Sequence, residues 1–522
     1  MFKKKVLALL IAVCLVFLCI GCSGSSTPEG DETSSTGKIK DTLVAAIRAD
    51  PENLDPHNNA NWPCFIVEEV IFDRLVQMDE NGKIQPMLAT SWEIIDDVTV
   101  RFNLRDDVYW HDGSKFTAED VRYTIARAVD MKGSITMMAA FDGPGTKVVD
   151  DYTVDIKTKY PFGPLFRYLV SSRGNIVCAA HVEKVGVEAH GRNPMGTGPF
   201  KFVSWNSGDR INLEKNDEYW GELPNFDKMV FRVIPEASSR ALEVESGAVD
   251  VALHIDEADV ARLKESSDVN LVSGPSYTTH QINFNIYKNE WLQDPRVRKA
   301  LFVAVDKPAL VKAVYGDTAG PSTSAFSHML PYHTPADKNS YDPELAKQLL
   351  DEAGFDYNTK IVINVQNDAV LIKDAEVLQN MWGQIGLDVA VEISDQSAFS
   401  AILASRDFMM NMATNSCTSG DPDHQLFDWK TNKHGIILNE EYEPISDEAA
   451  EIYDLIMSSR ASLDDAVRTE RYAKLQDIMC NEYYGMFMLA DVNAIYCIGN
   501  DVQDFYCSPA YMPNLARVNF AN

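Results

Sequence analysis

Few residues in this sequence have the types and spacing that catalysis requires. Trp110-His111-Asp112-Gly113 places an imidazole beside a carboxylate, but Asp-Gly before a helical segment is typical of a turn. Met195-Gly196-Thr197-Gly198-Pro199 is glycine-rich, yet it lacks the third glycine of a phosphate-binding loop and also ends in proline. His181 and His190 do not share a helical face, and we interpret them as surface residues. The sequence has no GxSxG, HExxH or P-loop motif, which favours binding without covalent chemistry.

The position of Cys22 predicts a covalent modification. The basic residues 3–5 precede fifteen apolar residues, Val6 to Ile20, and Gly21-Cys22 follows. This pattern is typical of a signal peptide, because a membrane span takes roughly 20 residues. The end of the run resembles the cleavage site of bacterial lipoproteins, whose new N-terminal cysteine carries a diacylglycerol. We expect residues 1–21 to be removed, Cys22 to be the lipid attachment site and residues 22–40 to form a flexible tether. A short uncleaved anchor is the alternative.

The composition excludes some partners and leaves the state of the cysteines open. A formal charge of −30 should repel phosphate backbones, so nucleic acid is not an expected partner. The length is sufficient for two or three domains. Beyond Cys22 the chain has Cys64, Cys178, Cys417, Cys480, Cys497 and Cys507. These six include no CxxC pair, so a zinc site is not expected, whereas disulfides and buried free thiols both remain possible.

Strands and helices alternate along the chain. Residues 43–47 predict a buried strand, and residues 99–104 predict a strand with one apolar face. Residues 118–129 predict a helix that begins at a capping box formed by Thr117 and Asp120.

A later segment predicts a parallel sheet. Asp342 precedes a proline at a predicted helix start, and Gly354 predicts the end of that helix. Residues 361–365, 374–385 and 389–393 have the patterns of strand, helix and strand. This order predicts a right-handed βαβ unit and an α/β fold.

Several longer stretches resemble one protein family. They are PMLATSW at 86–92, RFNLR at 101–105, WHDGSKFTAEDV at 110–121, GTGPF at 196–200, NDEYWG at 216–221, DPRVRKALFVAVDKPALVKAVYG at 294–316, AKQLLDEAGF at 346–355 and GDPD at 420–423. Their order and spacing resemble the extracellular solute-binding proteins of family 5, the oligopeptide-, dipeptide- and nickel-binding receptors of ABC importers. The resemblance implies a periplasmic-binding-protein-like fold of type II in its large three-domain form.

The resemblance also implies how the chain divides. Domain I would comprise residues 41–72, 190–285 and 490–522, domain II residues 73–189, and domain III residues 286–489. The ligand would lie in the cleft between domains I and III, and closure about a hinge would enclose it.

The expected ligand pocket departs from that of the peptide-binding members. These carry a Trp and then an Asp shortly before the Asp-Pro that matches Asp421-Pro422, and the Asp pairs with the peptide ammonium. The corresponding residues here are Asn415 and Thr418. An ammonium buried without a carboxylate loses a hydrogen bond of about 1.5–3 kcal/mol. We expect Asn415, Ser416, Thr418 and Asp421 to be ligand contacts, with Asp421 as a possible replacement anchor. The alternative is a turn whose polar residues face water.

Three further residues are candidate ligand contacts. Dipeptide-binding members hold the ligand carboxylate with an Arg after the strand that matches 361–366, where this chain has Asn367 and no arginine. Trp62 follows a turn that borders the cleft in the family, and it would stack on the ligand or belong to the core. Asn283 lies at the crossing into domain III, where we expect a hinge hydrogen bond first and a ligand contact second.

These observations predict a lipid-anchored, monomeric solute receptor outside the cytoplasm. It would capture a peptide or peptide-like solute by hinge closure and deliver it to an ABC transporter permease. No cofactor, metal or catalytic residue is expected. The missing anchors leave a modified peptide, an oligosaccharide or a metal chelate as other ligands. A sensor or pheromone receptor with the same fold and an exported hydrolase remain as alternatives.

Overall fold

One mixed sheet extends through much of the chain and carries the residues that form the candidate site. The computed structural model describes residues 40–521 except 80–81, 132–133, 427–428 and 430–433. The predicted signal peptide, the lipid attachment at Cys22 and the tether up to residue 39 lie outside the described residues.

The large sheet has eleven strands in the order β15-β14-β16-β12-β17-β11-β1-β10-β9-β8, and β13 pairs with β17 beside that path. These strands are β1 Thr42–Ile47, β8 Phe200–Asn206, β9 Arg210–Lys215, β10 Lys228–Val233, β11 Val251–Leu253, β12 Val269–Phe284, β13 Ala319–Pro321, β14 Lys360–Gln366, β15 Asp388–Ser394, β16 Met410–Asn415 and β17 Met486–Gly499.

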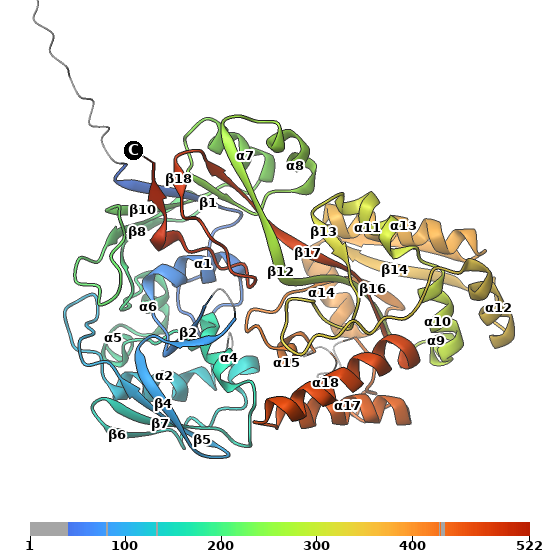
Figure 1. The fold of residues 1–522 in the computed structure, drawn as a ribbon, viewed down its shortest axis with the longest axis horizontal. Coiled ribbons are helices and arrows are strands. Elements are labelled where there is room, and N and C mark those ends of the chain that lie inside the picture. Colours follow the sequence, from blue (N-terminus) through green and yellow to red (C-terminus); the bar gives the residue numbers. More distant parts are fainter. Residues whose placement is uncertain (1–39, 80–81, 132–133, 427–428, 430–433, 522) are drawn as a thin grey trace, which may run out of the picture. The chain divides into compact units, whose positions relative to one another are not determined.

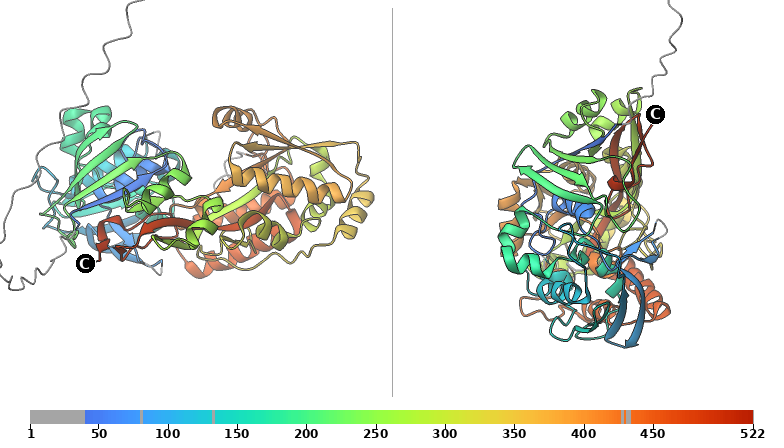
Figure 2. Two further views of the ribbon diagram at one scale, coloured as in Figure 1. Left: turned by 90° about the horizontal axis from the view of Figure 1, so that it is seen from above. Right: turned by 90° about the vertical axis from the view of Figure 1, so that its left-hand side faces the viewer.

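Strands β12 and β17 join the two halves of this sheet. They contain 16 and 14 residues and are antiparallel to each other. β12 pairs with β16 through Thr279 to Phe284, whereas β17 pairs with β11 through Tyr496 to Ile498. Figure 1 and the left view of Figure 2 show the two strands, in green and dark red, side by side between the half with β1 and β10 and the half with β14 and β16. Any movement of one half relative to the other must therefore bend or twist this pair.

A smaller antiparallel sheet has the order β4-β5-β7-β6. Its strands are β4 Ala89–Asp96, β5 Thr99–Leu104, β6 Lys147–Asp150 and β7 Thr153–Lys157. Two short pairs complete the described strands: β2 Val76–Met78 with β3 Ile84–Pro86, and β18 Val502–Gln503 with β19 Asn519–Phe520.

The described α-helices surround these sheets. They are α1 Trp62–Ile71, α2 Ala118–Ala128, α3 Ile135–Met138, α4 Leu165–Val170, α5 Ala179–Val185, α6 Val187–Arg192, α7 Ala237–Glu245, α8 Glu257–Lys264, α9 Glu290–Gln293, α10 Pro295–Val303, α11 Lys307–Tyr315, α12 Pro343–Ala353, α13 Ala369–Gln384, α14 Gln396–Ser405, α15 Pro422–Gln425, α17 Asp447–Arg460 and α18 Asp465–Ile478. None of the helices in the described part of the chain is long and apolar enough to cross a bilayer.

The buried apolar residues form separate cores. The first takes its residues from Tyr277 to Ala510 and the second from Leu75 to Met195. The third combines β1, β10 and the segment after β17, and a small fourth core lies beneath α7 and α8. Met78 packs against both the first and the second core. The limits of the three domains given above stay a prediction.

The local signals in the sequence predicted several elements correctly. β5 spans the predicted strand, and α2 begins after Thr117 with the capping box to Asp120 present. β14 and β15 are parallel neighbours, with Ile361 opposite Val389, as the βαβ prediction requires. The helix between them starts earlier than residue 374, because the Asp368 carboxylate accepts hydrogen bonds from the first amides of α13.

The described cysteines from Cys64 to Cys507 are free thiols. All are buried except Cys507, which is partly exposed. Burial raises the pKa of Cys64 and Cys480 to about 12. These thiols therefore pack as small apolar side chains, which is one of the two possibilities that the sequence left open.

Candidate functional site

The loop that follows β16 brings several predicted residues to the middle of β12. Asn415 lies opposite Thr279 of β12, and its Nδ2 donates a hydrogen bond of 3.0 Å to the carbonyl oxygen of Gln425. The next residue, Ser416, is exposed, and its Oγ lies 2.9 Å from Oγ1 of Thr278. Asn415 thus ties the loop to α15, whereas Ser416 presents a hydroxyl group beside β12.

Asp421 has a structural partner that sequence reasoning missed. Its side chain is buried, and both carboxylate oxygens accept hydrogen bonds from Nη2 of Arg468, at 2.8 and 2.9 Å. It also caps α15 by accepting from the amide of Asp423 at 2.9 Å. Burial alone would lower the pKa of Arg468, but the Asp421 carboxylate raises it above its ordinary value. This pairing argues against Asp421 as the replacement anchor for a ligand ammonium.

A second buried ion pair lies beside the first. Asp423 accepts a hydrogen bond of 3.2 Å from Nη1 of Arg460 and one of 2.6 Å from the hydroxyl of Tyr168. Tyr168 belongs to α4, so this contact joins α4 to α15 and α17. The two ion pairs hold α15, at the end of the loop, against α18 through Arg468 and against α17 through Arg460.

The middle of the loop passes close to two side chains from other elements. Gly420 has a φ of +68°, and a Cβ atom there would lie 3.2 Å from Cε2 of Tyr277 and 3.4 Å from Nη1 of Arg167. Thr418 is half-buried, and no other described residue forms a hydrogen bond with its hydroxyl. The loop therefore offers polar groups and a nearby guanidinium, but it offers no unpaired carboxylate.

Trp62 belongs to an aromatic cluster with His254 and Tyr511. Its ring centroid lies 4.0 Å from that of His254 in a T-shaped arrangement, and His254 is stacked on Tyr511 at 5.7 Å. Burial raises the pKa of Tyr511, while the nearby hydroxyls of Ser276 and Thr278 lower it. Contacts thus run from Trp62 through Tyr511 and Thr278 to Ser416. Trp62 is half-buried, so part of its ring remains available to a ligand.

Asn283 and Asn367 do not take part in this set of contacts. Asn283 is fully buried, accepts from Nε2 of Gln281 at 2.8 Å and donates to Oδ1 of Asn411 at 3.1 Å. It is therefore a hydrogen-bonding residue between β12 and β16, and its role at a hinge stays a prediction. Asn367 is exposed at the end of β14, where its amide donates to the carbonyl oxygen of Ser394 at 2.8 Å.

His190 contradicts the prediction that His181 and His190 are surface residues. It is completely buried and packs edge-on against Phe72, with its ring centroid 5.4 Å from that of His181. Burial lowers its pKa to about 4, so the imidazole is neutral at pH 7. The turn predicted at 110–113 is present: the amide of Gly113 donates to the carbonyl oxygen of Trp110 at 2.8 Å.

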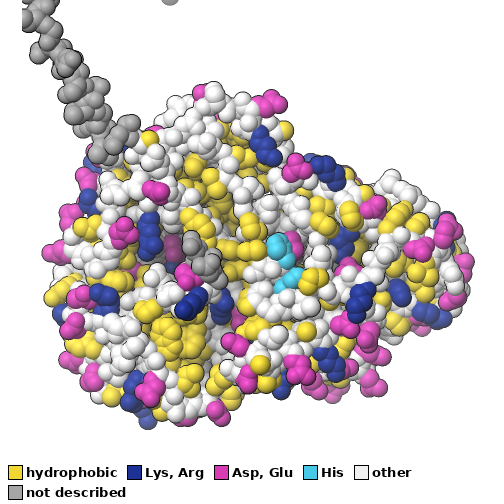
Figure 3. Space-filling model, in the orientation of Figure 1, with side chains coloured by type: hydrophobic (Ala, Val, Ile, Leu, Met, Phe, Trp, Pro, Cys, Tyr) yellow, Lys and Arg dark blue, Asp and Glu magenta, His cyan; other side chains and the backbone are white. Residues whose placement is uncertain are grey.

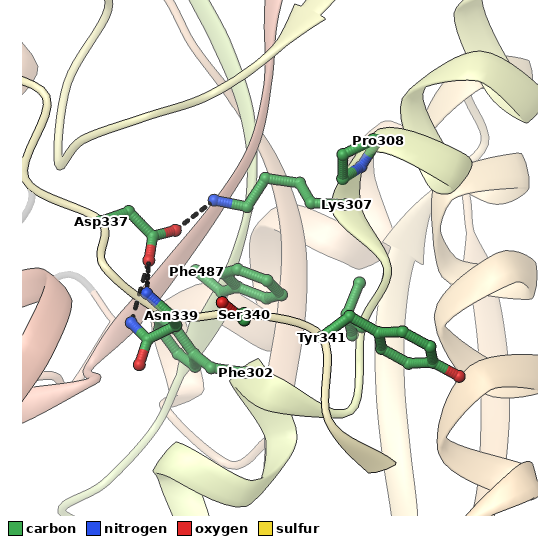
Figure 4. A pocket seen from close by; sticks show the side chains of 9 residues that line it. Phe302, Lys307, Pro308, Asp337, Asn339, Ser340, Tyr341 and Phe487 are labelled. Atoms are coloured by element: carbon green, nitrogen blue, oxygen red, sulfur yellow. Dashed lines mark hydrogen bonds and ion pairs between the residues drawn. The ribbon is translucent and has the colours of Figure 1, made fainter.

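Neither of two concavities in the structure contains a predicted ligand contact. The cavity in Figure 4 has a volume of about 60 Å³ and is lined by Phe302, Phe487 and the ion pair of Lys307 with Asp337. Such a volume holds one or two water molecules and no larger solute. A more open depression of about 510 Å³ lies along α6. The candidate site is therefore defined by the contacts that link Trp62 to Ser416 through Tyr511 and Thr278, and not by these two cavities.

Two further observations concern the distribution of side chains on the surface and the side chains that could bind a metal ion. Figure 3 shows a face on which hydrophobic side chains gather in the middle and acidic ones are scattered mainly toward the edges. Among the described residues, no group of three His, Cys, Asp or Glu side chains has the arrangement of a metal site.

The fold agrees with comparisons to known proteins. Residues 83–435 match the model of the bacterial extracellular solute-binding proteins, family 5. The dipeptide-binding protein of Escherichia coli (strain K12) is 29% identical over 476 residues, with coverage of 84% of this chain and 87% of that protein. The glutathione-binding protein GsiB of Shigella boydii serotype 4 (strain Sb227) is 25% identical over 449 residues, with the same coverage.

A solved structure shows the same fold. NikA from Brucella suis, in complex with Fe(III)-EDTA, superimposes with a TM-score of 0.82 at 23% identity, covering 92% of this chain and all of that one. The chain belongs to family 5 of the bacterial extracellular solute-binding proteins. The predicted family and fold are confirmed, and its relatives are binding proteins rather than enzymes.

Proposed function

We propose that this chain is a lipid-anchored receptor that captures a peptide or peptide-like solute and delivers it to the permease of an ABC importer. Support comes from its family and from relatives named for dipeptide and glutathione binding. The receptor would act as a monomer outside the cytoplasm, held at the membrane through Cys22.

The observation that carries the binding site is the set of contacts from Trp62 through Tyr511 and Thr278 to Ser416. Trp62 and Tyr511 pack against the core that contains β1, whereas Cys417, next to Ser416, belongs to the core that contains β14 and β16. A solute here would touch residues from both sides of the connecting strands. Such sites commonly combine an aromatic surface with a few placed polar groups.

The mechanism that we propose is closure about β12 and β17. These strands connect the two halves of the large sheet, so a small change in their twist would move Trp62 relative to Ser416. A solute that contacts both sides stabilises the closed arrangement by its differential affinity for it. A metal chelate and an oligosaccharide remain alternative solutes, the first because a structural relative holds Fe(III)-EDTA.

Mass spectrometry of the native protein tests this function. The protein is purified without denaturation, and bound solutes are then released and identified. We expect a small solute that is recovered unchanged and that makes the particle more compact in small-angle scattering when added back. It should also raise the free energy of unfolding, by about 2.7 kcal/mol at a concentration of 100 times the dissociation constant.

A pair of variants locates the site. Trp62→Leu should weaken binding of the recovered solute, because it removes the aromatic surface but keeps an apolar side chain. Trp291→Leu changes another half-buried tryptophan, which packs against Phe355 in the first core, and it should leave binding unchanged. Equal binding by both variants would refute this location of the site, and turnover of the solute by the purified protein would refute the receptor function.

A further inference from the structure

Arg167 is a half-buried cation at the candidate site without a strong acceptor. It lies on α4, and among the described residues its guanidinium has one hydrogen-bond partner, Sδ of Met78, at 2.7 Å from Nη1. No carboxylate of the described residues lies within 4.0 Å of it. A thioether sulfur is a weak acceptor, so most of the donor groups of Arg167 are still free to bind another group.

The arginines that flank the same loop differ from Arg167. Arg468 binds both carboxylate oxygens of Asp421, and Arg460 binds Asp423. These two buried acids are therefore already neutralised. Arg167, in contrast, has no carboxylate partner among the described residues, so its positive charge remains beside the loop.

The position of Arg167 directs this charge toward the candidate site. Its Nη1 lies 3.4 Å from where a Cβ atom of Gly420 would be, and Tyr277 lies at 3.2 Å from the same point. Tyr277 directly precedes Thr278 on β12, so the two side chains leave the strand on opposite faces. Arg167 is therefore connected to the candidate site through the loop after β16, which carries both Gly420 and Ser416.

We propose that Arg167 binds a carboxylate group of the transported solute. This inference rests on the proposed function and adds the chemical class of the solute, which is a small organic acid or a peptide with a free carboxylate. The planar guanidinium can donate two parallel hydrogen bonds to such a group. Loss of the charge should raise the dissociation constant by about 10-fold or more.

Tyr277 supplies a second donor at the same place. No described residue accepts a hydrogen bond from its hydroxyl. Burial raises the pKa of Tyr277 to about 12, although Arg167 acts in the opposite direction. The hydroxyl thus keeps its proton at pH 7 and is able to donate to a carboxylate oxygen.

Variants of Arg167 in the complete protein test this inference. Arg167→Gln removes the charge, Arg167→Lys keeps the charge but loses the planar fork, and Arg210→Gln changes an exposed arginine that pairs with Asp209 on β9. Solutes that co-purify with each protein are released by denaturation and quantified by mass spectrometry. We expect carboxylate-bearing solutes in the native protein, at least 10-fold less in Arg167→Gln, an intermediate amount in Arg167→Lys and no change in Arg210→Gln.

Defined probes give an independent measurement by calorimetry. N-acetyl-trialanine has a free carboxylate, and N-acetyl-trialanine amide has none. The native protein should bind the acid at least 10-fold more tightly than the amide, and Arg167→Gln should abolish this difference. The unfolding temperature of each variant without a probe establishes that it is folded.

The outcomes separate this inference from the proposed function. Three results would each overturn the role of Arg167: co-purified solutes without a carboxylate, an equal amount of solute in Arg167→Gln, or a preference for the acid that survives in this variant. The protein would still be a receptor. If the native protein carries no co-purified solute and binds neither probe, the proposed function is overturned, and this inference with it.

Discussion

The hydroxyl of Tyr168 on α4 donates a hydrogen bond of 2.6 Å to Oδ2 of Asp423 on α15, and both side chains are buried. The two residues are 255 positions apart in the sequence. Asp423 also binds Arg460, so the tyrosine adds a hydrogen bond to a buried charge that is already paired. This contact fixes α4, which carries Arg167, against the segment that carries Thr418 and Gly420.

Tyr168→Phe should destabilise the protein. The substitution removes one hydrogen bond to a buried carboxylate that also pairs with Arg460, so we expect the free energy of unfolding to fall by about 1.5–3 kcal/mol. Urea denaturation followed by fluorescence measures this change. Tyr341→Phe removes the hydroxyl of an exposed tyrosine and should change the stability by less than about 0.5 kcal/mol. Equal effects of the two substitutions would mean that the Tyr168 hydroxyl contributes nothing to stability.

His190 should make the stability depend on pH in mildly acidic solution. Burial lowers its pKa from 6.5 to about 4 in the folded protein. Between these values the unfolded chain binds more protons than the folded one, so the stability contributed by neutral His190 is complete above pH 6.5 and is lost as the pH falls to about 4. The slope is at most about 1.4 kcal/mol per pH unit for one proton.

The variant His190→Gln isolates this effect, because glutamine does not titrate. Denaturation curves at pH 4 to 7 should show a smaller loss of stability in acid for the variant than for the native protein. His333→Gln is the control, since His333 is partly exposed, although burial also lowers its pKa. A native-like acid slope in His190→Gln would show that other groups account for the pH dependence.

The sequence predicted those elements that depend on neighbouring residues. The capping box of α2 and the C-terminal Gly354 of α12, which has a φ of 68°, are set by side chains within a few positions. The Asp368 cap was missed, although it is also local and Leu371, Ala375 and Leu378 recur at helical spacing from the first turn of α13. Burial of His190 was missed because it depends on Phe72, far away in the sequence.

The site was predictable only in part. Similarity to the family directed attention to Trp62 and Ser416, and the structure connects these two residues through Tyr511 and Thr278. No local pattern distinguishes either connecting residue from an ordinary tyrosine or threonine of a strand or loop. The pairing of Asp421 with Arg468 was also invisible, because a sequence shows an acid but not the base that neutralises it.

Cys22→Ala should release the protein from the membrane. A diacylglycerol on Cys22 supplies two buried chains, which is what stable anchoring requires. We expect cell fractionation to move the variant from the membrane to the medium or the soluble envelope fraction. Cys507→Ala changes a thiol that is only partly exposed in the folded part, and it should leave the protein in the membrane fraction. A Cys22→Ala protein that stays in the membrane and keeps its leader would show that the chain is held by an uncleaved anchor.

Thr418→Asp should improve the binding of peptides with a free ammonium group. Asp421 is bound by Arg468, and the resemblance to peptide-binding members implies that Thr418 replaces their acid, so the loop after β16 offers no free carboxylate for an ammonium. Unmodified di- and tripeptides should therefore bind with dissociation constants no tighter than roughly 1 μM, or about −8 kcal/mol.

The new carboxylate of Thr418→Asp should tighten calorimetric binding of trialanine by about 10-fold, whereas N-acetyl-trialanine should gain nothing. Thr469→Asp places the same charge on the exposed side of α18 and should have no effect. Nanomolar binding of an ordinary dipeptide by the native protein would contradict this prediction, because it would require an acidic partner outside the loop, such as Glu257 near Tyr511.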